Sequence, residues 1–382
     1  MIRVVHVITG LGGGGAETTL SRLLGVLAPP EFDNHVIALT GDDELAPVIR
    51  RLGVPVHLLG MGKGPSALHG VWKLRRLLRR IAPDVVQTWL CHADLLGGIV
   101  AWHTLRCPVV WGVHQAEAPA ATPWITRLVL ALCARLAGRL PARVVSCSEA
   151  GRRARVAAGF PPDCFEVIPN GVDVTVFRPD PAARAAVRTA LGVATGAPLL
   201  AWPARWHPDK DPQTFLACAA RLHAARPEVR FLLFGLGLAA DNAALVAAID
   251  AAGLRDCMLL LGFRTDVPAL FAACDFVVLS SATEALPNVV LEAMACGLPV
   301  AATDVGDVAE VVAACGEVVP PRDPVALAGA VERLLERDEP ARRALAAAAR
   351  ERIERHYSLA ATAARYAATY RTLAPHPGVA EA

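Results

Sequence analysis

Short, uninterrupted apolar runs recur along the first half of the chain, at residues 4–8, 36–39, 85–87, 109–113 and 144–147. Runs of this length are typical of strands buried on both faces of a parallel sheet. The intervals between them have the apolar spacing of helices, for example at residues 17–27 and 67–81. This alternation predicts an α/β domain built on a doubly wound parallel sheet.

The same alternation returns after a Pro-rich segment at residues 177–181, which suits a domain linker. Apolar runs then occupy residues 199–202, 230–234, 258–261, 276–279, 300–303 and 317–319, and residues 342–373 read as one or two Ala-rich helices. We expect an α/β protein with two Rossmann-like domains facing a central cleft, residues 1–177 and 178–350. A helix over residues 351–373 returns to the first domain, and residues 374–382 form a tail.

Composition narrows the class of protein. The 382 residues carry a formal net charge of +2 and only 5% aromatic residues, which argues against a nucleic-acid partner. Ten cysteines are scattered without a C-x-x-C pair or zinc-like spacing, as in a cytoplasmic protein with reduced thiols. No leader is recognisable before the first strand, and no apolar run approaches the length of a membrane span.

A glycine-rich turn follows the first predicted strand: residues 9–17 read TGLGGGGAE and open a helix. Glycines let a phosphate approach the backbone, where the N–H groups of the helix start favour an anion. A tight turn without a ligand is the alternative. A dinucleotide oxidoreductase would also need an acid at the end of the second strand, where Asp42 comes late and after a glycine.

The strongest pattern is EALPNVVLEAMACGLPV at residues 284–300. It predicts a polar loop that holds Glu284, a helix that starts near Pro287 or Asn288, and a stop at Gly297. Glu292 then lies just beyond the first helical turn. Two carboxylates near a helix start suit the vicinal hydroxyls of a sugar or ribose, although a pair of ordinary surface glutamates is the alternative.

This segment resembles the retaining nucleotide-sugar glycosyltransferases of family 4, the glycosyl transferases group 1, which have the GT-B fold. Their hallmark is two glutamates separated by seven residues. The resemblance extends to IPNGVD at residues 168–173, ARWHPDKD at 204–211, LGFRTDV at 261–267, and ATDVG at 302–306 followed by Glu310. Two departures stand out: Leu236 replaces an acidic residue, and Ala285 replaces a glycine.

The resemblance implies roles for individual residues. Arg205 and Lys210 would hold the donor diphosphate, Glu284 the transferred sugar, and Glu292 the ribose hydroxyls. His114, at the end of WGVH, would face the donor sugar, although a lone histidine is more often structural. The remaining donor contacts would come from Gly13, Gly14, Gly15, Phe263, Arg264, Leu286, Asn288 and Val289.

The resemblance further implies same-face transfer without a cofactor or metal, from a nucleotide-diphosphate sugar, with a UDP-sugar favoured over a GDP-sugar. Asp209 and Asp211 form a D-x-D pattern, but a lysine separates them and the Arg–Lys string matches better than a metal motif. The rival enzymes are a nucleotide-sugar epimerase or hydrolase and a dinucleotide-dependent oxidoreductase. A partner subunit that binds a nucleotide sugar without turnover is a third alternative.

The acceptor is expected to be a glycan or a lipid-linked molecule of bacterial polysaccharide or glycolipid synthesis, contacted by loops such as residues 115–123. A basic amphipathic helix over residues 67–81 carries Lys73, Arg75, Arg76, Arg79 and Arg80. It is either a solvated face or a peripheral contact with the cytoplasmic face of a membrane. Residues 124–140 have the same ambiguity.

Overall fold

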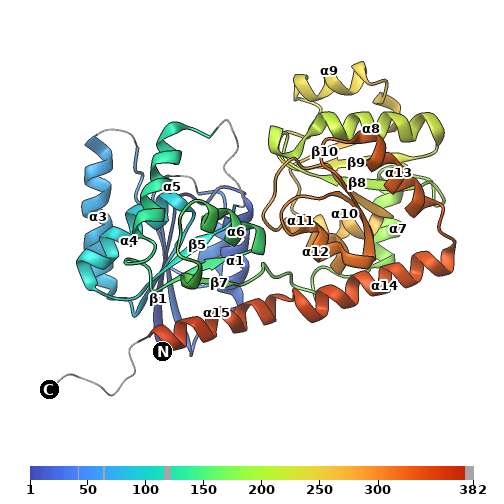
Figure 1. Ribbon diagram of the computed structural model, residues 1–382. Coiled ribbons are helices and arrows are strands. Elements are labelled where there is room, and N and C mark those ends of the chain that lie inside the picture. The colour runs from blue at the N-terminus through green and yellow to red at the C-terminus, as the bar shows by residue number, and fades with distance from the viewer. Residues whose placement is uncertain (42, 63–64, 116–121, 375–382) are drawn as a thin grey trace. The chain divides into compact units, whose positions relative to one another are not determined.

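The computed structural model describes residues 1–41, 43–62, 65–115 and 122–374 (Figure 1). Contacts divide the chain into two compact units. The first unit comprises Met1–Gly171 and the chain from Leu359 onward, and the second unit comprises Val172–Ser358. Each unit is a parallel sheet covered by helices, as the alternation of apolar runs and helical intervals predicts.

The first unit has a seven-stranded sheet in the order β3-β2-β1-β4-β5-β6-β7. The strand order changes direction between β1 and β4, which makes their carboxyl ends the switch point where ligands of such sheets bind. Two edge strands of three half-buried residues, β3 and β7, carry too short an apolar run to be predicted. The strands are β1 (Ile2–Ile8), β2 (Phe32–Ala38), β3 (Val56–Leu58), β4 (Val85–Trp89), β5 (Val109–Val113), β6 (Arg143–Ser146) and β7 (Phe165–Val167).

Helices cover both faces of this sheet, because alternate residues of each strand point to opposite sides. Val4 and Ile8 of β1 pack with α1 (Gly15–Val26), α2 (Ala46–Arg51) and α15 (Leu359–Leu373). Val5 and Val7 pack with α3 (Pro65–Ile81), α4 (Cys91–Leu105) and α5 (Trp124–Leu136) on the other face. The helix α6 (Glu149–Ala157) follows β6.

The C-terminal helix α15 completes the first unit. Its buried Tyr370 hydroxyl donates to Gln87 Oε1 at 3.2 Å, and Tyr366 stacks on Trp89 with ring centroids 6.1 Å apart. Residues 351–358 precede this helix and belong to the second unit, and the first six of them end α14 (Glu339–His356). Of the helix expected over residues 351–373, the part from Leu359 therefore packs on the first sheet.

The second unit has a six-stranded sheet in the order β10-β9-β8-β11-β12-β13, with its own switch point between β8 and β11. The strands are β8 (Leu199–Pro203), β9 (Arg230–Phe234), β10 (Met258–Gly262), β11 (Phe276–Leu279), β12 (Val300–Thr303) and β13 (Gly316–Val319). The helices before α14 are α7 (Pro181–Ala190), α8 (Pro212–Ala225), α9 (Ala243–Ala251), α10 (Val267–Ala273), α11 (Asn288–Ala295), α12 (Val308–Val312) and α13 (Pro324–Leu335).

The chain enters the second unit at Val172, six residues before the boundary expected from the Pro-rich segment. The Val172 N–H donates to the Tyr357 carbonyl at 2.9 Å. The Arg350 guanidinium donates to the carbonyls of Val174 and Phe177 at 3.1 and 3.2 Å. Because these contacts fasten residues 172–177 to the second unit, the change of unit comes before the prolines.

Asp275 anchors β11, the strand that leads to the Glu284 loop. Its carboxylate accepts from the Leu199 N–H at 2.8 Å and pairs with Arg184 and Arg188 at 2.6 and 3.5 Å. Arg188 is buried, and it also donates to the Ala273 carbonyl. A buried arginine left without its carboxylate is strongly destabilising.

Replacing Asp275 with Ala is therefore expected to lower the free energy of unfolding by about 3 kcal/mol, measured by urea denaturation. The matched control is Asp250→Ala, which breaks a pair with Arg255 in which both side chains are largely in solvent. The control is expected to leave the midpoint nearly unchanged. Equal effects of the two substitutions would contradict the anchoring role.

Candidate functional site

Two loops meet at the switch point of the second sheet. One follows β8 and carries Lys210, and the other follows β11 and carries Glu284. The Ser280 hydroxyl donates to the Lys210 carbonyl at 2.7 Å, and the Ala282 N–H donates to the Asp209 carbonyl at 2.8 Å. These bonds hold the loops together through their backbones, independently of any ligand.

The two predicted site residues Lys210 and Glu284 form a mostly buried ion pair, in which Lys210 Nζ donates to Glu284 Oε1. The Ser281 hydroxyl donates to the same oxygen at 2.7 Å. In turn, the Thr303 hydroxyl at the end of β12 donates to the Ser281 carbonyl at 2.7 Å. A cation and an acid thus lie side by side in a fixed frame where a sugar and its phosphate can be bound together.

The two buried serines were not predicted as site residues. Ser280 accepts from the Trp202 indole N–H at 3.1 Å, and Trp202 stacks on Phe215 with ring centroids 4.4 Å apart. Their only sequence signal is their position: two hydroxyl residues directly after a buried strand, three and four residues before Glu284. The partners of the Ser280 hydroxyl, Lys210 and Trp202, are distant in the sequence, whereas the Ser281 hydroxyl donates to Glu284, three residues on.

Other site residues predicted in the second unit lie close to Lys210 or Glu284 in the sequence. Arg205 is exposed and makes no ion pair within the described part of the chain. Helix α11 starts at Asn288, as predicted, directly after Leu286 and Pro287, and Val289 follows in its first turn. Glu292 is buried in the next turn. The helix ends before Gly297, which has the expected left-handed φ of +74°.

Phe263 and Arg264 follow the end of β10. The Phe263 side chain is exposed, and the Arg264 guanidinium donates to Asp266 at 2.6 and 2.7 Å. The neighbouring turn depends on Gly235, because a Cβ there would lie 1.9 Å from the Ala204 carbonyl oxygen. The loop after β9 is therefore packed backbone to backbone against the loop after β8, which carries Lys210.

The D-x-D acids have structural contacts. Asp211 caps α8, accepting from the Thr214 N–H at 3.2 Å and the Thr214 hydroxyl at 2.6 Å. Asp209 lies 3.3 Å from His207 Nδ1. No cluster of three His, Cys, Asp or Glu residues fit to hold a metal occurs in residues 1–41, 43–62, 65–115 and 122–374.

In the first unit, the glycine turn leads into α1 with Gly14 at the N-cap. The Gly13 N–H donates to Glu44 Oε2 at 3.1 Å, and Gly15 begins the helix. A carboxylate therefore already accepts from the backbone that was predicted to meet a phosphate. Glu44 was not anticipated, since it lies beyond the second strand. Asp42, on which the oxidoreductase alternative depended, lies outside the described residues.

His114 directly follows β5 and stacks on Trp89, with ring centroids 4.8 Å apart and planes 19° from parallel. Both ring nitrogens are buried, and neither has a hydrogen-bond partner in the part of the chain that is described. Burial lowers the pKa of His114 to about 4, so the ring is neutral at pH 7. Residues 116–121 of the expected acceptor loop lie outside the description.

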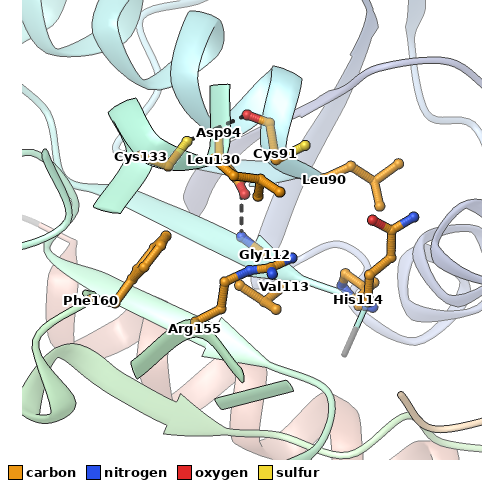
Figure 2. Close-up of a pocket in the computed structure, with 11 residues that line it drawn as sticks. Leu90, Cys91, Asp94, Gly112, Val113, His114, Leu130, Cys133, Arg155 and Phe160 are labelled. Carbon is orange, nitrogen blue, oxygen red and sulfur yellow. Dashed lines mark hydrogen bonds between the residues drawn. The ribbon is translucent and has the colours of Figure 1, made fainter. Parts of the chain in front are cut away.

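A pocket beside His114 contains a buried acid, Asp94 of α4, and Figure 2 shows it among the lining residues. Its carboxylate accepts from the Thr88 hydroxyl at 2.6 Å and from the Gly112 N–H at 3.2 Å. Burial raises the pKa of Asp94 to about 7 despite these bonds. Asp94 thus braces the end of β5, two residues before His114.

Comparison with known proteins decides the family. The family model described as Glycosyltransferase Family 4 matches residues 13–176, and Glycosyl transferases group 1 matches residues 197–337. A D-inositol 3-phosphate glycosyltransferase of Thermobispora bispora is 32% identical over 97% of this chain and 88% of its own length. This chain belongs to glycosyltransferase family 4. It is therefore a glycosyltransferase, and the oxidoreductase alternative is set aside.

Solved structures agree on the fold of this glycosyltransferase. Alr3699/HepE of Anabaena, solved with UDP-glucose, has a TM-score of 0.85 and 25% identity, covering 98% of this chain and all of that one. The sucrose-phosphate synthase of Thermosynechococcus elongatus has a TM-score of 0.81 and 21% identity over 97% of this chain and 99% of that one. The predicted GT-B fold, with its two Rossmann-like domains, is confirmed.

Gly306 offers a test of how the Glu284 loop is positioned. Its φ is +60°, and a Cβ there would lie 2.5 Å from the Glu284 carbonyl oxygen and 2.4 Å from that of Ala285. Gly306→Ala is expected to reduce glycosyltransferase turnover at least tenfold, because the loop must shift. Gly192→Ala is the control: its φ is +66°, but a Cβ would meet open space. Equal turnover in both variants would contradict this account.

The raised pKa of Asp94 implies that the free energy of unfolding depends on pH. Its folded pKa of about 7 exceeds the unfolded value of 3.8, so the folded state holds the extra proton between these values. Its contribution to the free energy of unfolding therefore decreases as the pH rises through this window. Asp94→Asn cannot ionise and keeps an acceptor for Thr88. We expect the variant to gain stability relative to the unmodified protein from pH 4 to pH 8, by at most about 4 kcal/mol. Parallel pH curves from urea denaturation would refute this.

Proposed function

We propose that this enzyme is a retaining, metal-independent glycosyltransferase that moves a hexose from a nucleotide-diphosphate sugar to an acceptor hydroxyl. The observation that carries the proposal is the Lys210–Glu284 pair at the switch point of the second sheet. A pyrophosphate bound here gains a cation for the charge that grows on the leaving group. The adjacent carboxylate accepts hydrogen bonds from the sugar hydroxyls.

In the proposed complex, Lys210 and Arg205 bind the diphosphate, and Glu284 orients the sugar while Ser281 holds its carboxylate. When Lys210 binds a phosphate instead of Glu284, the Glu284 oxygen that Lys210 contacted becomes available to a sugar hydroxyl. The reaction is same-face attack by the acceptor oxygen: its bond to the anomeric carbon forms as the bond to phosphate breaks. The donor phosphate receives the acceptor proton.

Further donor contacts are proposed from both units. Glu292 binds the ribose hydroxyls, Phe263 and Arg264 meet the base, and His114 faces the sugar as a neutral ring. Backbone amides supply the remaining contacts, those of Gly13, Gly14, Gly15, Leu286, Asn288 and Val289. The proposed base is uracil, which is supported by the complexes of the 25% identical Alr3699/HepE with UDP and with UDP-glucose.

Two acceptor classes remain to be compared by experiment. A glycan or lipid-linked acceptor of bacterial polysaccharide or glycolipid synthesis follows from the family resemblance. An inositol phosphate is favoured by the name of the relative from Thermobispora bispora, D-inositol 3-phosphate glycosyltransferase. Offering both acceptors with a labelled UDP-sugar in the presence of a chelator identifies the class and tests whether a metal is needed.

The proposed location is the cytoplasm, at the inner face of a membrane. All ten cysteines are free thiols, as expected in a reducing compartment. Partial burial raises the pKa of Cys91, for example, to about 11, which keeps this thiol protonated and unreactive at pH 7. No described helix is long and apolar enough to cross a bilayer.

Nucleotide binding separates the proposed roles. UDP at about 100 times its Kd is expected to raise the free energy of unfolding by about 3 kcal/mol, measured as a thermal shift, and GDP is expected to give less. Lys210→Met should weaken binding of UDP but not of uridine, because uridine has no phosphate. Glu292→Gln should weaken both, because both carry the ribose.

The control for these variants is Arg255→Met, which removes an exposed cation outside the site. It is expected to bind UDP and uridine as the unmodified protein does. A Lys210 variant that binds UDP normally, or that loses uridine equally, would contradict the proposed phosphate contact.

A further inference from the structure

Helix α3 has a buried apolar face and a strongly cationic outer face. Leu74, Leu78 and Ile81 are buried against the sheet. Its exposed cations are Lys73, Arg75, Arg76, Arg79 and Arg80. The helix contains no acid, and none of these cations pairs with a carboxylate in the described part of the chain. The formal net charge of the whole chain is only +2, so this helix concentrates positive charge on one surface.

The same surface exposes large apolar side chains. On α3, Leu68 is 76% exposed and Trp72 is 55% exposed, with the Arg76 guanidinium 5.5 Å from the Trp72 ring centroid. On α5, Trp124 is 72% exposed, and Ile125 and Leu128 are each 50% exposed. Scattered apolar residues are normal on a protein surface, but two tryptophans and three aliphatic side chains, each at least half exposed, are many for two helices that pack on the same helix.

Helix α5 is apolar beyond what its packing requires. Apart from Thr126, Arg127 and Arg135, every residue from Trp124 to Leu136 is apolar. Cys133 is the one buried side chain of this helix. A helix that covers a sheet normally buries one apolar stripe and exposes a polar one. An apolar outer stripe without acids is typical of helices that lie in a membrane interface.

The topology brings these side chains to one end of the unit. Helices α3 and α5 both pack on α4, on the same face of the sheet (Figure 1). Each leads into the following strand of a parallel sheet and therefore starts at the carboxyl edge of the strands. Leu68 and Trp72 lie in the first half of α3, and Trp124, Ile125 and Leu128 lie in the first turns of α5. That edge also carries His114 and the glycine turn.

We propose that the outer surface of α3 and the first turns of α5 dock on a bilayer that contains acidic lipids. The five cations meet the lipid phosphates, and the two tryptophans enter the interface with Leu68, Ile125 and Leu128. The docking presents the carboxyl edge of the first sheet to the membrane. The biological purpose of this docking rests on the proposed function, since a lipid-linked acceptor would bind at that edge. The test of the docking itself requires no acceptor.

The experiment is sedimentation of the full chain with vesicles of phosphatidylcholine, with or without phosphatidylglycerol. We expect binding to the acidic vesicles only, and weaker binding as salt increases. The triple variant Lys73→Gln, Arg75→Gln, Arg76→Gln is expected to lose roughly 100-fold in partitioning, at about fivefold for each charge. The double variant Trp72→Ser, Trp124→Ser is expected to lose at least tenfold in partitioning, because it removes two aromatic side chains from the membrane interface.

Matched controls remove similar groups from the second unit. The triple variant Arg178→Gln, Arg221→Gln, Arg322→Gln takes away the same charge from exposed arginines, and Val325→Ser removes an exposed apolar side chain. Both are expected to bind acidic vesicles as the unmodified chain does. Equal losses in the α3 variant and the charge-matched control would overturn the proposal, because general attraction would then explain the binding.

Further outcomes would also overturn it. Two of these are the absence of vesicle binding and equal binding to neutral and acidic vesicles. A third is a stable dimer in solution that the tryptophan variant dissociates, because a second copy of the chain would then cover this surface. The thermal shift with UDP is measured on the same variants. Normal UDP shifts with lost vesicle binding support the docking surface. Vesicle binding without any nucleotide shift would contradict the proposed function and leave the docking surface standing.

Discussion

The structure of the second unit depends on one constraint: the loops after β8 and β11 are bonded to each other at the point where the strand order reverses. Ser280 holds the Lys210 backbone, and Ser281 holds the Glu284 carboxylate. A cation and an acid are thereby kept together before any ligand arrives. Fixed charges of this kind need no rearrangement when charge develops on a leaving phosphate, which is the condition for effective electrostatic catalysis.

The first unit has a different electrostatic character. At its switch edge two buried ionisable groups favour their neutral forms: burial lowers the pKa of His114 to about 4 and raises that of Asp94 to about 7. Charge is instead placed on the outer surface, along α3. The cationic flank along α3 is the surface that we propose to dock on acidic lipids.

Much of this architecture can be predicted from the sequence, because parallel strands buried on both faces appear as apolar runs and Gly297 marks the end of α11. The three-residue strands β3 and β7 could not be predicted, since they are half-buried and short. The family resemblance placed Lys210 and Glu284 at one site but did not predict their ion pair. Glu44 was missed because its partner Gly13 is distant in the sequence, and Ser281 was missed because Thr303, which holds its backbone, is equally distant. The chain enters the second unit at Val172 because Arg350 binds the carbonyls before the prolines.

The central claim is that Lys210 and Glu284 divide the donor between them, one taking the diphosphate and the other the sugar. A crystal structure of the enzyme soaked with a non-hydrolysable UDP-hexose tests this most directly. The account predicts Lys210 Nζ within hydrogen-bonding distance of a diphosphate oxygen and the Glu284 carboxylate on a sugar hydroxyl, with Ser281 still bound to Glu284. A donor bound away from this pair, with the Lys210–Glu284 contact intact, would contradict it.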